Sequence, residues 1–135
     1  MDFKTSVGQL ILDAVADAGG SLELDTIVSG LSRPPKAEMG DVAFACFPLA
    51  KQLRKSPVAI ASQLAAAIEG CLADTPLVSA VTTAGPYLNF RADVAGFART
   101  VLPEAIRGAL GPTSDGAGKS IVIDFSSPNV AKPFG

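Results

Sequence analysis

The fold class is decided by one stretch of the chain, AGPYLNFR at residues 84–91. Its Gly-Pro pair is a typical turn signal, and the residues after the turn alternate between polar and apolar with a period of two. Residues 77–83 are rich in β-branched side chains, so the two segments are expected to form a hairpin or a bent antiparallel pair. On the second strand, Leu88 and Phe90 are expected to face the core.

Three polar or aromatic residues, Tyr87, Asn89 and Arg91, share the opposite face of this strand. A ring, an amide and a guanidinium in a row can stack on a base, contact a base edge and pair with a phosphate. The same residue types are also common on the solvated face of a half-buried strand, where they bind nothing specific. The pattern alone leaves both interpretations open.

The other elements follow from apolar spacing and from breaking residues. The sequence predicts helices at residues 3–18, 42–53, 57–70 and 94–110, and a strand at residues 26–33. Pro48 is expected to start or kink the second helix, and Pro103 to interrupt the last one. The apolar side chains of that last helix are expected to face the core, with Asp93 as its N-terminal cap.

Composition indicates a folded domain with few special chemical groups. The chain has 135 residues, of which 48% are apolar and 18% charged, enough for one domain or one domain plus a fragment. No apolar run is long enough to span a bilayer, and no secretory pattern opens the chain, so a cytoplasmic location is expected. Histidine is absent, which removes the commonest metal ligand and neutral-pH base.

Charge and cysteine content add two further expectations. The formal net charge is -2 and the pI is about 4.9, which argues against tight autonomous binding of nucleic acid. Most basic residues nevertheless lie between Arg33 and Arg107, so a basic face is compatible with the sequence. Cys46 and Cys71 have apolar neighbours and are expected to be buried thiols rather than a disulfide.

The run IVIDF at residues 121–125 predicts a strand of a different kind. Near-continuous apolar runs are typical of strands buried on both faces of a parallel sheet, and Asp124 would lie at the ligand-binding carboxyl end. The expected fold class is therefore α+β, with a small antiparallel sheet packed with helices, followed by the first strand of a truncated α/β nucleotide-binding domain. The expected domain boundaries are residues 1–110, a linker at 111–120, and 121–135.

Several motifs resemble arginyl-tRNA synthetases. SPNVAKPF at residues 127–134 is similar to the stretch that opens their catalytic domain, and GDVAF at 40–44, LAK at 49–51 and GPYLNF at 85–90 resemble their N-terminal additional domain. The resemblance implies a domain that contacts the D-loop at the elbow of tRNA. Tyr87 and Asn89 match an aromatic-x-asparagine pair that reads an exposed base there. To this pair the chemistry of Arg91 adds a phosphate contact.

The resemblance also assigns roles in the tail. It implies that Asp124, Ser127 and Asn129 help to hold the arginine substrate and that Lys132 helps to stabilise the phosphates of ATP. ATP and L-arginine are thus expected as substrates of the full enzyme, and the fragment is expected to bind no cofactor. Gly135 stands where the family's H-x-G-H signature usually begins, so we expect no catalytic residue and no activity in this fragment.

Three functions remain in competition. The chain is the N-terminal part of an arginine–tRNA ligase that docks tRNA, a stand-alone RNA-binding module, or a structural or protein-interaction domain that only braces its neighbour. The unfinished strand from Ile121 favours the first function, because an independent module has no use for half of a parallel sheet. The acidic pI argues against the second.

Overall fold

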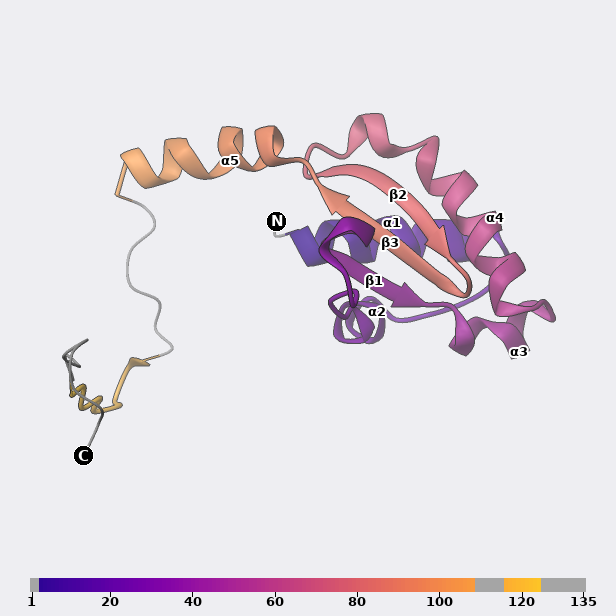
Figure 1. Ribbon diagram of the computed structural model, residues 1–135, viewed down its shortest axis with the longest axis horizontal. Coiled ribbons are helices and arrows are strands. Elements are labelled where there is room, and N and C mark those ends of the chain that lie inside the picture. Colours follow the sequence, from indigo (N-terminus) through magenta and orange to yellow (C-terminus); the bar gives the residue numbers. More distant parts are fainter. Residues whose placement is uncertain (1–2, 109–115, 125–135) are drawn as a thin grey trace, which may run out of the picture.

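A computed structural model describes residues 3–108 and 116–124. In chain order the elements are α1 (Phe3–Asp17), α2 (Leu24–Gly30), η1 (Ala37–Met39), β1 (Val42–Ala45), η2 (Phe47–Leu49), α3 (Ala50–Leu53), α4 (Pro57–Glu69), η3 (Leu72–Asp74), β2 (Val78–Ala84), β3 (Tyr87–Ala92) and α5 (Val94–Ile106), where η denotes a 3₁₀ turn. Helices α1 and α4 pack against the sheet, and α5 extends away from it (Figure 1). This confirms the expected α+β class with a small antiparallel sheet.

The sheet has three strands in the order β1-β3-β2, and both neighbours of β3 run antiparallel to it. The expected hairpin is confirmed: β2 and β3 pair across Gly85, whose φ of 58° is the left-handed conformation that such a tight turn requires. Because β3 is central, its side chains are flanked on both sides. Phe90 lies opposite Val42 of β1 and Val81 of β2, which places all three on the core face.

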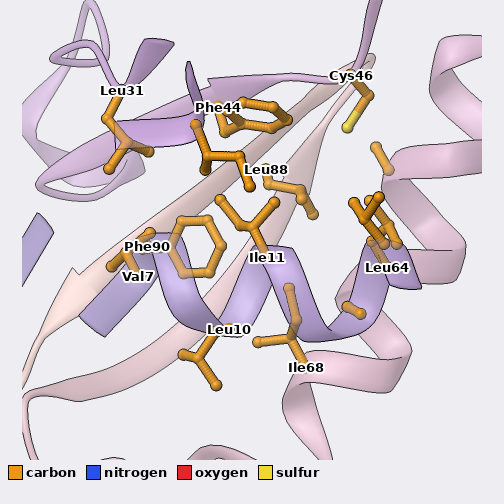
Figure 2. Packing of buried hydrophobic residues seen from close by; sticks show 14 of the residues in the cluster. Val7, Leu10, Ile11, Leu31, Phe44, Cys46, Leu64, Ile68, Leu88 and Phe90 are labelled. Carbon is orange, nitrogen blue, oxygen red and sulfur yellow. The ribbon is translucent and has the colours of Figure 1, made fainter. Parts of the chain in front are cut away.

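The core fills the space between the sheet and helices α1 and α4 (Figure 2). Leu88 and Phe90 of β3 are fully buried, as the alternation predicted, and Ile11 and Leu64 pack above them from the two helices. Burying a side chain of this size contributes about 1.5–3 kcal/mol relative to exposure. Helix α4 begins as expected at Ser56, whose hydroxyl accepts a hydrogen bond from the N–H of Ala59 at 3.2 Å.

The strand expected at residues 26–33 is wrong, because this segment forms helix α2. Leu24, Ile27 and Leu31 recur at helical spacing, and Ile27 and Leu31 are buried on that one side. The β-branched residues suggested a strand, but tertiary packing against α1 overrides that preference. Only Ser32, just after the helix, bridges to β1, opposite Ala43.

The helix expected at residues 42–53 is correct only in its second half. Strand β1 occupies its first residues, and the helical part starts at Phe47 with a 3₁₀ turn that continues into α3, near Pro48 as one alternative held. Asp41 precedes β1, and not a helix for which it could serve as N-terminal cap. Its carboxylate Oδ2 instead accepts a hydrogen bond from the N–H of Ala92 at 2.8 Å.

Two expectations for the C-terminal part are corrected. Helix α5 continues through Pro103, and most of its apolar side chains are exposed rather than inward. Residues 121–124 form no strand, and Ile121, Val122 and Ile123 are 74%, 94% and 67% exposed. Such a strand needs neighbouring parallel strands to pair with. Within the described ranges no helix is long and apolar enough to cross a membrane.

Candidate nucleic-acid interface

The candidate site lies on the face of the sheet away from the core. Tyr87, Asn89 and Arg91 of the central strand lie on this face, as the alternation predicted. Their neighbours on the flanking strands are small: Ala43 and Thr82 lie on either side of Asn89. Short flanking side chains leave space on this face of the sheet beside Asn89.

Asn89 is not exposed, contrary to expectation. It is only 3% exposed, although Tyr87 beside it on the same face is 40% exposed. The cover comes from residues 33–39, which cross above the sheet and turn its surface into a hollow of about 340 Å³. We call it the Asn89 hollow; its lining includes Arg33, Pro34, Met39, Ala43, Tyr87 and Asn89.

The amide of Asn89 is directed into this hollow rather than into the core. Its side chain makes no hydrogen bond with any described residue. Among the described residues, every side-chain nitrogen or oxygen without a hydrogen-bond partner keeps some contact with solvent. The two amide atoms of Asn89 therefore remain reachable from the hollow. An amide in this state has a free donor and a free acceptor, which is what contact with a base edge requires.

The cover over Asn89 is fixed to the central strand. The N–H of Asp41 donates to the carbonyl oxygen of Phe90 at 2.8 Å. Gly40 adopts a φ of 137°, and a Cβ on it would lie 2.7 Å from that same oxygen. Only glycine permits both this conformation and this close approach. The hollow is therefore a built feature of the fold and not a loose gap beside a loop.

Arg91 lies at the edge of a smaller hollow of about 150 Å³ that Asn89 also lines. Its Nη2 donates to the carbonyl oxygen of Glu38 at 2.6 Å, which holds the exposed guanidinium beside the cover. Lys36 pairs with the Glu38 carboxylate, Nζ to Oε1 3.7 Å, and both side chains are strongly exposed. With Arg33 nearby, the rim of the hollow carries more positive than negative charge.

An exposed aromatic pair, one member of which the sequence interpretation missed, stands beside the hollow. The ring of Phe47 meets the ring of Tyr87 edge to face, with centroids 6.0 Å apart and an interplanar angle of 88°. Phe47 is 54% exposed. The sequence predicted a helix at this position. The place of Phe47 beside Tyr87 was missed because strand β1, which ends at Ala45 opposite Tyr87, was not predicted.

The residues assigned to the tail are not gathered into a site. Ser127, Asn129 and Lys132 lie outside the described residues. Asp124 is described, and it is exposed. Within the described part, no group of three or more acidic or cysteine side chains is placed to hold a metal ion.

The two cysteines are free, as expected, but they differ in environment. Cys46 is fully buried at the end of β1, whereas Cys71 is exposed, which corrects the expectation of two buried thiols. Burial raises the pKa of the Cys46 thiol to about 11, because the charged thiolate would lose its hydration. Cys46 is therefore a packing residue beneath the site rather than a nucleophile.

These features define a class: a small α+β domain whose three-stranded sheet presents an aromatic ring and an unpaired amide in a hollow on its open face. Residues 5–92 match the family described as "Arginyl tRNA synthetase N terminal domain". The matched span runs from α1 to the end of β3 and includes the whole hollow. The chain belongs to this family.

Individual relatives agree with the family. The chain is 41% identical over 138 residues to an arginine–tRNA ligase of Clostridium perfringens and 38% identical over 136 residues to one of Clostridium botulinum. Each match covers 99% of this chain but only 22% of the ligase. Among solved structures, Thermus thermophilus arginyl-tRNA synthetase is similar, with 29% identity, a TM-score of 0.55, and coverage of 75% of this chain and 16% of that one.

Proposed function

We propose that this chain is the N-terminal part of an arginine–tRNA ligase and that the open face of its sheet docks the D-loop at the elbow of tRNA. The observation that carries the proposal is the unpaired amide of Asn89 in a hollow beside the exposed ring of Tyr87. Family membership supports the ligase assignment, and curated relatives that match 99% of this chain are arginine–tRNA ligases.

The hollow suits a single unstacked base. RNA is read in sequence mainly where bases are splayed out of the helix, stacked on aromatic rings and hydrogen-bonded at their edges. A base that enters the hollow can stack on Tyr87 while its edge meets the donor and acceptor of Asn89. A hydrogen bond to this amide is stronger than one at an exposed site, because water reaches the amide only through the hollow.

The surroundings of the hollow suit the rest of the nucleotide. Arg33 lines this hollow and Arg91 lines the smaller hollow that shares Asn89, so the two can neutralise phosphates of the nucleotides around the bound base. Phe47 supports the ring of Tyr87 through their edge-to-face contact. Because the chain carries a net charge of -2, this contact would position tRNA within a larger enzyme rather than bind RNA tightly by itself.

The remaining roles belong to the full-length protein. There, Asp124, Ser127 and Asn129 would hold L-arginine, Lys132 would help with the phosphates of ATP, and the enzyme would join arginine to tRNA. Carboxylate pairing with a guanidinium is suitable chemistry for Asp124.

The experiment compares Asn89→Ala with Gln9→Ala in the full-length ligase. Both changes remove an amide, but Gln9 lies on α1, on the other side of the sheet. Loss of a base-edge contact is expected to cost about 1–3 kcal/mol of tRNA affinity and to raise the KM for tRNA, while KM for ATP and arginine stays the same. Equal tRNA affinity in the wild type and in both variants would remove the docking proposal.

A further inference from the structure

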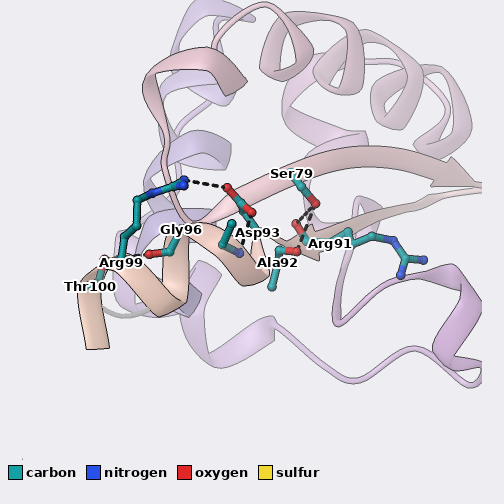
Figure 3. Close-up of polar contacts among 8 residues, drawn as sticks. Ser79, Arg91, Ala92, Asp93, Gly96, Arg99 and Thr100 are labelled. Carbon is teal, nitrogen blue, oxygen red and sulfur yellow. Dashed lines mark hydrogen bonds and ion pairs between the residues drawn. The ribbon is translucent and has the colours of Figure 1, made fainter. Parts of the chain in front are cut away.

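Helix α5 meets the rest of the domain in its first turn, through Gly96 and through Phe97, whose ring contacts the ring of Phe3 of α1 with centroids 5.9 Å apart. Gly96 is buried, and a Cβ at this position would lie 1.7 Å from the carbonyl oxygen of Pro76, so no larger residue fits. One turn later, Thr100 donates to the carbonyl oxygen of Gly96 at 3.0 Å and faces α1 across a shared hollow (Figure 3). These contacts fix which side of α5 is turned toward the domain.

Apart from Phe97, the large apolar side chains of α5 are turned away from the domain. Val94, Val101, Leu102 and Ile106, which we call the α5 stripe, are 79%, 40%, 57% and 85% exposed. Their spacing is that of one face of an amphipathic helix. Figure 1 shows the consequence: after its first turn the helix runs clear of the sheet and of the other helices.

A helix face of this kind normally has a cover, because contiguous exposed apolar surface marks an interaction site. The matched family is an N-terminal domain, and the matched ligases are far longer than this chain, which covers 22% of their length. The rest of those ligases therefore lies mainly C-terminal to the matched region. Helix α5 is the last helix of residues 3–108 and leads toward that part of the protein.

We propose that the α5 stripe packs against the C-terminal remainder of the full-length protein and thereby sets the angle at which the open sheet face is presented. RNA is a poor occupant, since the stripe contains no lysine or arginine to neutralise phosphate. A second copy of the chain is the other candidate occupant, and the test below separates it. The inference rests on family membership and not on the role of Asn89.

The test is amide hydrogen exchange of α5 in the full-length protein without tRNA. Leu102→Asp places a charge in the stripe, and Arg107→Asp places the same charge at the same end of the helix but off the stripe. If the stripe is covered by the remainder of the chain, amides of α5 exchange about tenfold or more faster in Leu102→Asp than in the wild type, and Arg107→Asp resembles the wild type. Peptides from β3 report whether the domain itself stays folded.

Three results would overturn the proposal. Equal exchange of α5 in wild type and Leu102→Asp would mean that nothing covers the stripe. Protection that disappears on dilution, with a dimer in sedimentation velocity, would assign the stripe to a second copy. Protection that requires tRNA would assign it to RNA. Should β3 lose protection in Leu102→Asp, the milder pair Leu102→Ser and Arg107→Ser answers the same question, because Leu102 is outside the core.

Discussion

The backbone N–H of Asp41 donates to the carbonyl oxygen of Phe90 at 2.8 Å, and this contact ties the cover of the Asn89 hollow to the central strand. The side chain of the same residue, Phe90, is fully buried on the core side of the strand. Core packing and the shape of the candidate site are therefore linked through one residue of β3. Changes that move this strand are expected to alter both.

Gly40→Ala is expected to destabilise the domain and distort the hollow together. The new methyl group would lie 2.7 Å from a backbone oxygen, and the φ of 137° is one that alanine rarely adopts. We expect a cost of about 1–3 kcal/mol, measured as a lower midpoint in urea. Gly70→Ala is the control, since Gly70 has a helical φ of -65° and no atom closer than 3.5 Å. Equal losses at the two positions would contradict this account of the cover.

Tyr87 is expected to act through its ring. Tyr87→Phe should retain most of the tRNA affinity, whereas Tyr87→Ala should lose about 1–3 kcal/mol, the usual value of stacking on one base. Phe47→Ala should cost less, because Phe47 supports the Tyr87 ring from its edge. Filter binding or anisotropy at one fixed salt concentration measures all three. If Phe and Ala at residue 87 are equally harmful, the hydroxyl rather than the stacking surface is what matters.

Arg91 and Arg99 provide a matched pair of arginines. Figure 3 shows their guanidinium groups directed away from each other: Arg99 pairs with Asp93 at 3.5 Å, and Arg91 lies at the rim of the hollows. Replacing Arg91 with Gln is expected to reduce the slope of log affinity against log salt by about 0.7–0.9, the value of one lost phosphate contact. Arg99→Gln should leave the slope unchanged. The same slope in both variants would exclude a phosphate role for Arg91.

Cys46 gives the domain a defined alkaline limit. Because burial raises the pKa of its thiol from 9.0 to about 11, the unfolded chain loses this proton at a lower pH than the folded one. The contribution of the neutral Cys46 thiol to the free energy of unfolding is complete below pH 9. It is lost between about pH 9 and pH 11, which lowers the free energy of unfolding by about 2 kcal/mol. Cys46→Ala should lack this part of the pH dependence. Exposed Cys71 is present in both proteins, so parallel curves would contradict the assignment.

The hairpin and its facing pattern could be predicted because they depend on local signals. Gly85-Pro86 fixes the turn, and strict alternation then places Leu88 and Phe90 on one side of β3. The short segments Leu24–Gly30 and Val42–Ala45 were assigned wrongly, because a few apolar or β-branched residues fit helix and strand equally well. Tertiary contacts decide such cases.

The burial of Asn89 and the exposure of α5 could not be predicted for a different reason. Alternation places Asn89 on the open face, but its cover comes from residues some fifty positions earlier in the chain, held there by Asp41. The amphipathic pattern of α5 indicates that its apolar side packs against a partner. The pattern does not state whether that partner lies within these 135 residues.

The most direct test of the central claim is a double-mutant cycle between Asn89 and the D-loop of tRNA. Wild-type and Asn89→Ala ligase are each titrated with native tRNA and with tRNAs carrying one abasic nucleotide in that loop. A direct contact predicts one abasic position at which the two losses fail to add, with a coupling of about 1–3 kcal/mol. Additive losses at every position of the loop would show that Asn89 reads no base there.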